Sequence, residues 1–314
     1  MDWESGVVWK KMGLIFQPEG QFGWMMSHAQ VPTVHVMQDR FRVFFSCRNE
    51  AGKSLTACID LDLENPAKIL QLYEHPVLGF GNPGAFDDDG VMPSYTIKHN
   101  KQLWMYYSGW NQRVNVPYHN AMGIAVSDDE GLTFNRLFEG PIMDRIATEP
   151  YVAVTPSVIK NGDEWKMWYV SGLRWILVNQ KYEPVYVIKY AHSDDGIHWQ
   201  RPNHICIPQR FPNEAFSHPN VMFANGQYEM WYCYRDSHDY RDGSGSYRMG
   251  YATSDDGLDW QRHDNQPLMV SDQGWDSKML CYPYVVKVGD KKVMFHNGNG
   301  FGKSGFGYAI WEGK

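Results

Sequence analysis

Four acidic side chains stand in loops that lead into recurring strand-like segments, and they are the candidates for acid–base chemistry. They are Asp89, Glu149, Glu214 and Asp276. Hydrolysis of a glycosidic bond uses a pair of carboxyl groups, about 5–5.5 Å apart for retention of configuration and about 6.5–9.5 Å apart for inversion. Asp89 with Glu149, or Glu214 with Asp276, would lie on neighbouring repeats and could reach such a spacing. The sequence does not decide between the two pairs.

A second set of side chains is basic, amide or aromatic and stands in the same loops or at the ends of neighbouring segments. Guanidinium groups bind carboxylate or phosphate through two parallel hydrogen bonds, so this set predicts an anionic group on the ligand. Aromatic rings at segment ends are platforms for the apolar face of a sugar, and the candidates are Trp24, Trp110 and Trp175. The predicted binding residues are His28, Gln30, Arg48, Trp110, Arg174, His218, Arg235, Lys278 and Asn297.

Structural roles remain open for several of these residues. Glu149 precedes a proline and could be a solvated loop residue, and Asp276 could cap a turn. Arg235 could pair with the neighbouring Asp236, and His218 could be a core histidine. A binding site is favoured because different repeats carry different polar residues at matching positions, whereas a purely structural repeat would keep them alike.

The elements that position these residues follow from a long sequence repeat, which is marked by a recurring proline. The prolines are Pro32, Pro93, Pro156, Pro219 and Pro283, and the gaps between them are 61, 63, 63 and 64 residues. Each proline stands near the start of a strand-like segment such as VPTVHV (31–36), where its missing N–H is tolerated. A second, aromatic segment such as LWMYYSGWN (103–111) is typical of a central strand buried on both sides. Three of the third segments end in turns whose aspartates can accept backbone hydrogen bonds, SDDEGLTF (127–134), SDDGIHW (193–199) and SDDGLDW (254–260).

The repeat predicts an all-β fold, namely a five-bladed β-propeller with four antiparallel strands per blade and a single domain over residues 1–314. The blades are expected to start near residues 24, 85, 149, 213 and 275. The last repeat lacks a fourth strand, and the segment VVWKKMGLIF (7–16) is predicted to complete blade five. This pairing would remove open sheet edges. The candidate side chains would then converge on a central funnel.

Composition and charge restrict the expected partners. The formal net charge is −7 and there is no basic stripe, so no nucleic-acid partner is expected. No apolar run is long enough for a membrane span, and the N-terminus lacks a signal-peptide pattern. The five scattered cysteines form no CxxC pair, which is typical of free thiols in a reducing compartment. We therefore expect a cytoplasmic protein, a monomer or a small homo-oligomer, with no metal site and no cofactor.

The segments FDDDGVMPS (86–94), YYSGWN (106–111) and CYPYVV (281–286), with the SDDGxxW turns, resemble the five-bladed β-propeller glycoside hydrolases. This superfamily comprises families 43, 32, 68, 62, 117 and 130, and the resemblance is nearest to uncharacterised family 43-like propellers. It extends over essentially the whole chain. It implies a funnel-shaped sugar site and, in active members, carboxylates from different blades. Members hydrolyse, transfer or phosphorolyse glycosidic bonds.

The chain departs from the pattern of that superfamily at the recurring prolines. In the superfamily a catalytic Asp directly precedes the proline of early blades, and a catalytic Glu lies two residues before the proline of a later blade. The residues directly before the five prolines are here Val31, Met92, Thr155, His218 and Tyr282. No acidic residue occupies either position, so carboxylates would have to come from farther upstream in the loops.

We predict a carbohydrate-active protein, a glycosidase that acts on an acidic or phosphorylated sugar. Asp89 and Glu214 are the first acid–base candidates, with Glu149 and Asp276 in reserve. The alternatives are a non-catalytic or differently catalytic sugar-recognition propeller linked to polysaccharide metabolism, and a glycoside phosphorylase. A sialidase-like enzyme is suggested by three arginines and by the Asp-box spacing of SDDEGLTF, but sialidases normally use six blades. The expected partner is a small molecule or an oligosaccharide.

Overall fold

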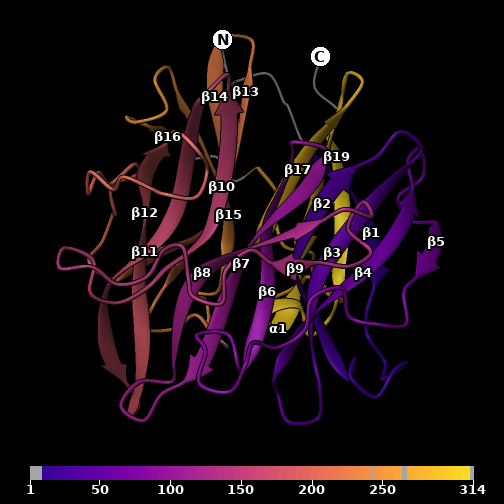
Figure 1. The fold of residues 1–314 in the computed structure, drawn as a ribbon. Coiled ribbons are helices and arrows are strands. Elements are labelled where there is room, and N and C mark those ends of the chain that lie inside the picture. Colours follow the sequence, from indigo (N-terminus) through magenta and orange to yellow (C-terminus); the bar gives the residue numbers. More distant parts are fainter. Residues whose placement is uncertain (1–8, 242, 264–266, 312–314) are drawn as a thin grey trace.

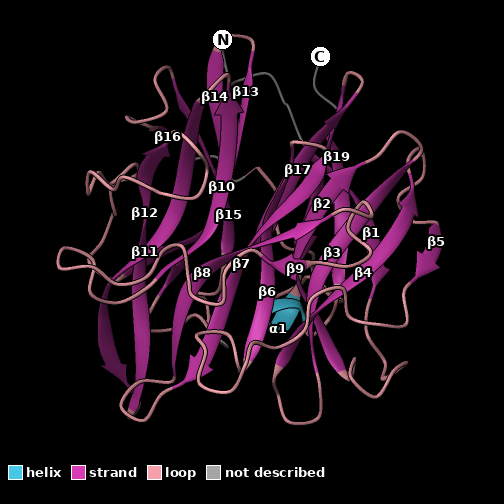
Figure 2. Ribbon diagram, viewed as in Figure 1, coloured by secondary structure: helices cyan, strands magenta, loops and turns pink. Residues whose placement is uncertain are grey.

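The computed structural model describes residues 9–241, 243–263 and 267–311. Strands and loops make up almost all of this part of the chain, with one short helical segment, α1 (Asn299–Gly302) (Figure 2). The all-β prediction is therefore confirmed. Within each of the groups given below, neighbouring strands pair antiparallel, as expected for segments joined by short turns; the first two groups are also joined by one parallel pair, Ser54 of β4 with Gly90 of β6.

The strands form groups that follow the repeat. The first two groups are β2 (Ser27–Val36), β3 (Arg40–Arg48), β4 (Ser54–Asp62) and β5 (Ile69–Leu72), then β6 (Gly90–His99), β7 (Gln102–Gln112), β8 (Tyr118–Ser127) and β9 (Asn135–Arg136). The next two are β10 (Ala153–Asn161), β11 (Glu164–Val178) and β12 (Lys181–Ser193), then β13 (Glu214–Ala224), β14 (Gln227–Asp236), β15 (Arg248–Ser254) and β16 (Gln261–His263). The last is β17 (Cys281–Val288), β18 (Lys291–Asn297), β19 (Phe306–Trp311) and β1 (Trp9–Phe16).

Strand β1 belongs to the last sheet although it lies at the other end of the chain (Figure 1). It pairs antiparallel with β19, with Trp9 opposite Trp311 and Phe16 opposite Phe306. The predicted pairing of residues 7–16 is thus observed from Trp9 onward. Val7 and Val8 lie outside the described residues.

One predicted outer strand is missing from the third group. After the turn at 193–199, the chain makes only isolated bridges with β12, between His192 and Gln200 and between Lys189 and Ile205. Pro202 lies between these bridges and has no N–H to donate to a ladder. The third group therefore has three strands in the described part of the chain, where four were predicted.

The aromatic second strands pack their side chains between neighbouring groups. Trp168 of β11 lies in one cluster with Met230 and Ala252 of the next group, and the rings of Phe41 and Phe295 lie 5.4 Å apart across another boundary. The first strands of the groups also contact one another in order: β2 contacts β6, β6 contacts β10, β10 contacts β13, β13 contacts β17, and β17 contacts β2. Positions about one repeat apart in the sequence are thereby brought together.

Candidate functional site

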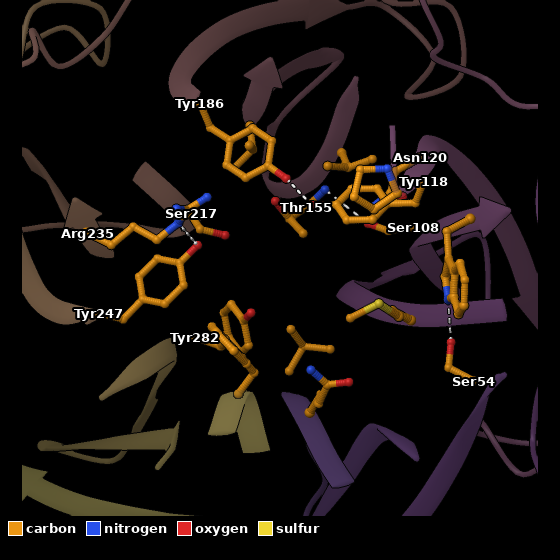
Figure 3. Close-up of a pocket in the computed structure, with 18 of the residues that line it drawn as sticks. Ser54, Ser108, Tyr118, Asn120, Thr155, Tyr186, Ser217, Arg235, Tyr247 and Tyr282 are labelled. Carbon is orange, nitrogen blue, oxygen red and sulfur yellow. Dashed lines mark hydrogen bonds between the residues drawn. The ribbon is translucent and has the colours of Figure 1, made fainter. Parts of the chain in front are cut away.

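A central cavity of about 300 Å³ lies where the first strands of the groups meet. In every group, a residue one or two positions before the recurring proline lines this cavity, namely Val31, Met92, Thr155, Ser217 and Tyr282. Figure 3 shows labelled side chains pointing toward one opening from several strand groups. Matching positions of the repeat thus meet at one shared cavity.

The backbone is strained around this cavity. The angle φ lies between +46° and +55° at the residue before four of the five prolines, namely Val31, Thr155, His218 and Tyr282. Branched or bulky L-residues rarely adopt such angles. The ladder register shifts at the same places, which is typical of a β-bulge. Because strain of this kind is concentrated at binding and active sites, the bulges make this cavity the candidate functional site.

Arg235, near the end of β14, is a cation of the cavity wall that has no carboxylate partner within the described ranges. Its Nε donates to Tyr247 Oη (3.0 Å), its Nη1 to Ser237 Oγ (3.2 Å) and its Nη2 to the Pro184 carbonyl (2.8 Å). The guanidinium also lies 3.5 Å from the ring centre of Tyr240. These neutral partners fix the orientation of Arg235 without cancelling its charge, although the residue is only 2% exposed.

Arg48, the last residue of β3, is a second cation of the lining. Its Nε donates to Gln30 Oε1 (3.3 Å), and no ion pair joins it to another described residue. Burial lowers the pKa of Arg48, but a guanidinium stays protonated in a protein. A third arginine of the lining, Arg241, is neutralised by Glu183 at 2.7 Å. The cavity therefore carries two uncompensated positive charges.

Phenols, hydroxyls and one indole supply most of the remaining polar lining. Tyr118 Oη lies 2.5 Å from Tyr186 Oη, and Trp110 Nε1 donates to Ser54 Oγ (2.7 Å). Burial raises the pKa of Tyr186 well above its ordinary value, so this phenol is protonated at neutral pH. Hydroxyl groups that can donate or accept, combined with aromatic faces, suit a sugar that has both polar hydroxyls and an apolar C–H face.

No aspartate or glutamate is among the described residues that line the cavity. Val31, Met92, Thr155 and Tyr282 line it at positions directly before the prolines, where the superfamily pattern would put a catalytic Asp in early blades. Glu183 lies behind the lining, where it accepts hydrogen bonds from Tyr240 and Arg241. The lining therefore offers cations and neutral donors, without a pair of carboxylates.

Glu214 and Asp276 each form a buried ion pair within their own strand group. Glu214 accepts two hydrogen bonds from Arg262 of β16, at 2.6 and 3.0 Å, and its side chain is 1% exposed. Asp276 pairs with Lys11 of β1 at 2.7 Å and is 2% exposed. In both cases the cation comes from the outer strand of the group.

Glu149 and Asp87 repeat this arrangement in two other groups. Asp87 pairs with Arg136 of β9 at 2.8 Å, and Glu149 lies 3.9 Å from Arg201, which follows β12. Tyr169 Oη of the central strand donates to Glu149 at 2.9 Å. We call Asp87, Glu149, Glu214 and Asp276 with their basic partners the radial ion pairs. Their recurrence favours a structural role for Glu149, Glu214 and Asp276, whose predicted catalytic roles stay untested.

Asp89 is the most accessible of the four predicted carboxylates. Its side chain is 17% exposed and pairs with Lys53 at 2.7 Å, and it accepts a hydrogen bond from the Gln112 N–H at 2.8 Å. These two contacts hold the pKa of Asp89 below its ordinary value. A general acid needs a raised pKa, so this environment suits Asp89 better as a base or nucleophile. Its backbone contacts Ser54 and Trp110, which line the cavity, but Asp89 itself does not.

The predicted binding residues divide into two sets. Gln30, Arg48, Trp110 and Arg235 line the cavity. The others lie outside the lining and are His28, Arg174, His218, Lys278 and Asn297.

Two residues of the second set, Asn297 and Arg174, hold neighbouring segments together. Asn297 is buried, donates to the Ala29 and Gly305 carbonyls, and accepts from the Val31 N–H, so it holds β2 against the last sheet. Arg174 donates to the Pro212 carbonyl and to Asn213.

The other members of that set are two histidines and a lysine. His218 is buried with its Nδ1 3.2 Å from the Pro283 carbonyl. His28 Nδ1 lies 2.8 Å from Ser27 Oγ, and burial with nearby Arg48 lowers the pKa of His28 to about 4. Lys278 is exposed.

Sequence reasoning missed the tyrosines of the lining. Tyr118 is the first residue of β8, Tyr247 directly precedes β15, and Tyr186 lies within β12. Tyr186 and Tyr247 each stand seven residues before an SDDG turn, and this matched spacing was the signal in the sequence that could have identified them.

Within the described residues there is no cluster of three or more His, Cys, Asp or Glu that could hold a metal ion. No helix among them is long and apolar enough to cross a membrane.

No known family profile matches the chain. Over 309 residues the chain is 35% identical to the uncharacterized protein Rv1502 of Mycobacterium tuberculosis (strain ATCC 25618 / H37Rv), a match that covers 98% of this chain and 100% of that protein. The chain belongs to the Rv1502 family. The chain is also similar, over a shorter stretch, to the beta-1,2-mannobiose phosphorylase of Thermoanaerobacter sp. (strain X514). The two sequences are 26% identical over 171 residues, and the match covers 51% of this chain and 53% of the phosphorylase.

Solved structures give the fold of this member of the Rv1502 family. It is similar to a glycoside hydrolase, with a TM-score of 0.75 and 17% identity over 98% of this chain and 92% of the other. It is similar to a thermostable family-43 glycoside hydrolase, with a TM-score of 0.65 and 17% identity over 95% of this chain and 96% of the other. It is also similar to a structure from the GH130 family of mannoside phosphorylases, with a TM-score of 0.71 and 13% identity over 99% of this chain and 95% of the other. The predicted resemblance to propeller glycoside hydrolases is therefore confirmed at the level of the fold.

Proposed function

We propose that this protein is a carbohydrate-active enzyme of the propeller glycosidase type that holds an anionic group of its substrate in the central cavity. The observation that carries the proposal is the pair of arginines, Arg48 and Arg235, which face a shared cavity without carboxylate partners among the described residues. A buried, uncompensated cation is costly unless a ligand supplies the opposite charge. The phenols and Trp110 beside them suit the hydroxyls and the apolar face of a sugar ring.

The architecture that we propose for this site is the five-bladed propeller, as one domain over residues 1–314. The blades would start near residues 24, 85, 149, 213 and 275, and β1 would complete the fifth blade. The order of contacts among β2, β6, β10, β13 and β17, which returns from β17 to β2, supports a closed ring. The pairing of β1 with β19 supports closure by the N-terminal strand.

Two reactions fit a glycosidic substrate at such a site. Hydrolysis needs two carboxylates at about 5–9.5 Å, and none of the described lining residues is acidic. Phosphorolysis uses inorganic phosphate as the attacking group, so the protein supplies only an acid, while arginines can hold the phosphate. The cavity arginines and the partial similarity to a beta-1,2-mannobiose phosphorylase make phosphorolysis the second candidate. Asp89, whose contacts lower its pKa, stays the first carboxylate to test as a base or nucleophile in hydrolysis.

The binding proposal is tested by calorimetric titration with galacturonate, glucuronate and mannose 1-phosphate, each compared with its neutral parent sugar. We expect the acidic ligands to bind at least tenfold more tightly than the neutral ones, and Arg48→Gln to remove that preference. The matched control is Arg40→Gln, because Arg40 pairs with Asp39 and Asp60 and is not among the lining residues. Equal binding of acidic and neutral sugars, or binding of neither, would contradict the proposal.

The reaction is tested with mannobiose and aryl glycosides in the presence and absence of inorganic phosphate. Release of a sugar 1-phosphate only when phosphate is present identifies phosphorolysis, and cleavage without phosphate identifies hydrolysis. Asp89→Asn is expected to reduce hydrolysis, in which Asp89 would serve as base or nucleophile. Unchanged turnover in Asp89→Asn would remove Asp89 from the chemistry, and no cleavage under any condition would leave a sugar-binding propeller.

A further inference from the structure

A second hollow of about 520 Å³ adjoins the central cavity and shares one wall with it. The shared residue is Tyr118 at the start of β8, which lines both spaces. The loop before it continues the boundary, with Pro117 lining the central cavity and Val116 the second hollow. We call this hollow the side groove. The two spaces are therefore separated by the thickness of one side chain and one loop.

The side groove repeats the aromatic character of the central cavity. Trp175 of β11 lines the groove, and its ring lies 5.4 Å from that of Tyr118 with an angle of 69° between their planes. Tyr118 is in turn held by Tyr186 on the cavity side. Trp175 is partly exposed and lines the groove. This arrangement continues the apolar lining of the cavity outward without a break.

The side groove, like the central cavity, is positively charged. Two arginines line the groove, Arg113 and Arg145. Arg113 is exposed, its backbone N–H donates to the Pro117 carbonyl, and within the described ranges its guanidinium has no hydrogen-bond or ion-pair partner. Arg145 lies 3.7 Å from Asp144, whose carboxylate also takes a closer contact, at 2.8 Å, with His119. One carboxylate thus faces two basic neighbours, and the groove keeps a positive surplus.

We infer that the side groove is a second subsite, which holds the next acidic sugar unit of an anionic oligosaccharide whose first unit occupies the central cavity. The inference rests on the proposed function of the cavity. It specifies the substrate class as an oligosaccharide with negative charges on successive units. Trp175 packs on the second sugar ring, and Arg113 pairs with its acidic group.

The inference is tested by comparing a monosaccharide with its trimer in calorimetric titrations, using galacturonate with trigalacturonate and mannuronate with trimannuronate. In the wild type we expect one trimer to bind about tenfold more tightly than its monomer, because one aromatic platform and one charge pair are added. Trp175→Ala and Arg113→Gln are each expected to reduce this gain to less than about threefold and to leave the affinity for the monomer unchanged. Leu177→Ala is the matched control, because Leu177 is 62% exposed on the same hairpin and does not line the groove.

The outcomes separate this inference from the function on which it rests. If neither monomers nor trimers bind, the proposed function fails. If a monomer binds but its trimer binds no better, or if the gain survives in both groove variants, the second subsite is overturned. An equal gain with neutral mannotriose over mannose would overturn the assignment of an acidic unit to the groove.

Discussion

The two uncompensated arginines of the cavity differ in how firmly they are held. Arg235 has three hydrogen-bonded partners and stacks on Tyr240, whereas Arg48 donates only to Gln30. A guanidinium fixed in advance loses less conformational freedom when it binds an anion. Arg235 is therefore the rigid contact of the cavity and Arg48 the adjustable one.

This difference predicts unequal effects of lysine substitutions. Arg48→Lys keeps a charge at an adjustable position, so we expect less than about a tenfold loss of affinity for an acidic sugar. Arg235→Lys loses the planar fork and its stacking, so we expect a larger loss of affinity and a decrease of about 1–3 kcal/mol in the free energy of unfolding. Titration calorimetry measures the affinity, and urea denaturation measures the free energy of unfolding. Equal behaviour of the two variants would show that preorganisation of Arg235 is unimportant.

At the scale of single residues, the sequence located only part of the cavity wall. Arg48, Arg235, Gln30 and Trp110 were expected near the funnel and do line the cavity. Residue type and segment position did not separate them from Arg174 and Asn297, which stand at comparable segment ends but make other contacts outside the lining. The lining tyrosines were not foreseen, since a tyrosine in an aromatic strand looks the same in sequence whether it faces the core or a cavity.

The radial ion pairs are the feature that recurs at the scale of the element. In four groups an acid just before the first strand, or at its first residue, meets a cation from the outer edge, as Asp276 meets Lys11 and Glu214 meets Arg262. Such a pair ties the loop to the edge of its own group and so fixes where the first strand begins. That placement in turn sets the position of the residues that line the cavity.

Removing one partner of a radial ion pair is expected to be costly, because the other charge stays buried. Arg262→Met should lower the free energy of unfolding by about 3–5 kcal/mol, while the double variant Glu214→Gln/Arg262→Met should recover most of that loss. Denaturant unfolding of the single and double variants measures this. The same double variant decides the role of Glu214: retained activity makes it structural, and lost activity in a stable protein restores it as a catalytic residue.

The sequence could not separate these acids from catalytic ones. Glu149, Glu214 and Asp276 occupy matched places in the repeat, but their partners come from distant segments: Glu214 meets Arg262 48 residues later, and Asp276 meets Lys11 265 residues earlier. The acids also looked dissimilar because two repeats carry Asp and two carry Glu, namely Asp87 and Asp276, and Glu149 and Glu214. The strands themselves were predictable, since turns and aromatic alternation are local signals. The exception was the segment around Pro202.

At the scale of the whole molecule, the stability of the protein depends on histidines that are buried in different sheets. His218 and His296 are 2% and 0% exposed, and burial lowers the pKa of each to about 4. In the unfolded chain each would titrate near its ordinary pKa of about 6.5. As pH falls from about 6.5 toward 4, the unfolded state therefore binds protons that the folded state does not, and stability is lost in that window.

Each of these histidines should contribute a slope of about 1.4 kcal/mol per pH unit within the window. His218→Asn removes one contribution and retains a residue that tolerates the positive φ of this position, so its stability should fall less steeply between pH 6 and 4.5. Urea unfolding at several pH values gives the slope. His75→Asn, at an exposed position, is the control and should leave the slope unchanged. An unchanged slope in His218→Asn would show that His218 is not kept neutral by burial.

The sharing of the last sheet between the two ends of the chain has a consequence for biosynthesis. Strand β1 emerges from the ribosome first, but its partner β19 begins only at Phe306. At translation rates of about 5–20 residues per second, the apolar edge of β1 would wait roughly 15–60 s for its partner. A circular permutant whose chain starts between β1 and β2 would make the four strands of that sheet in succession and would remove this delay.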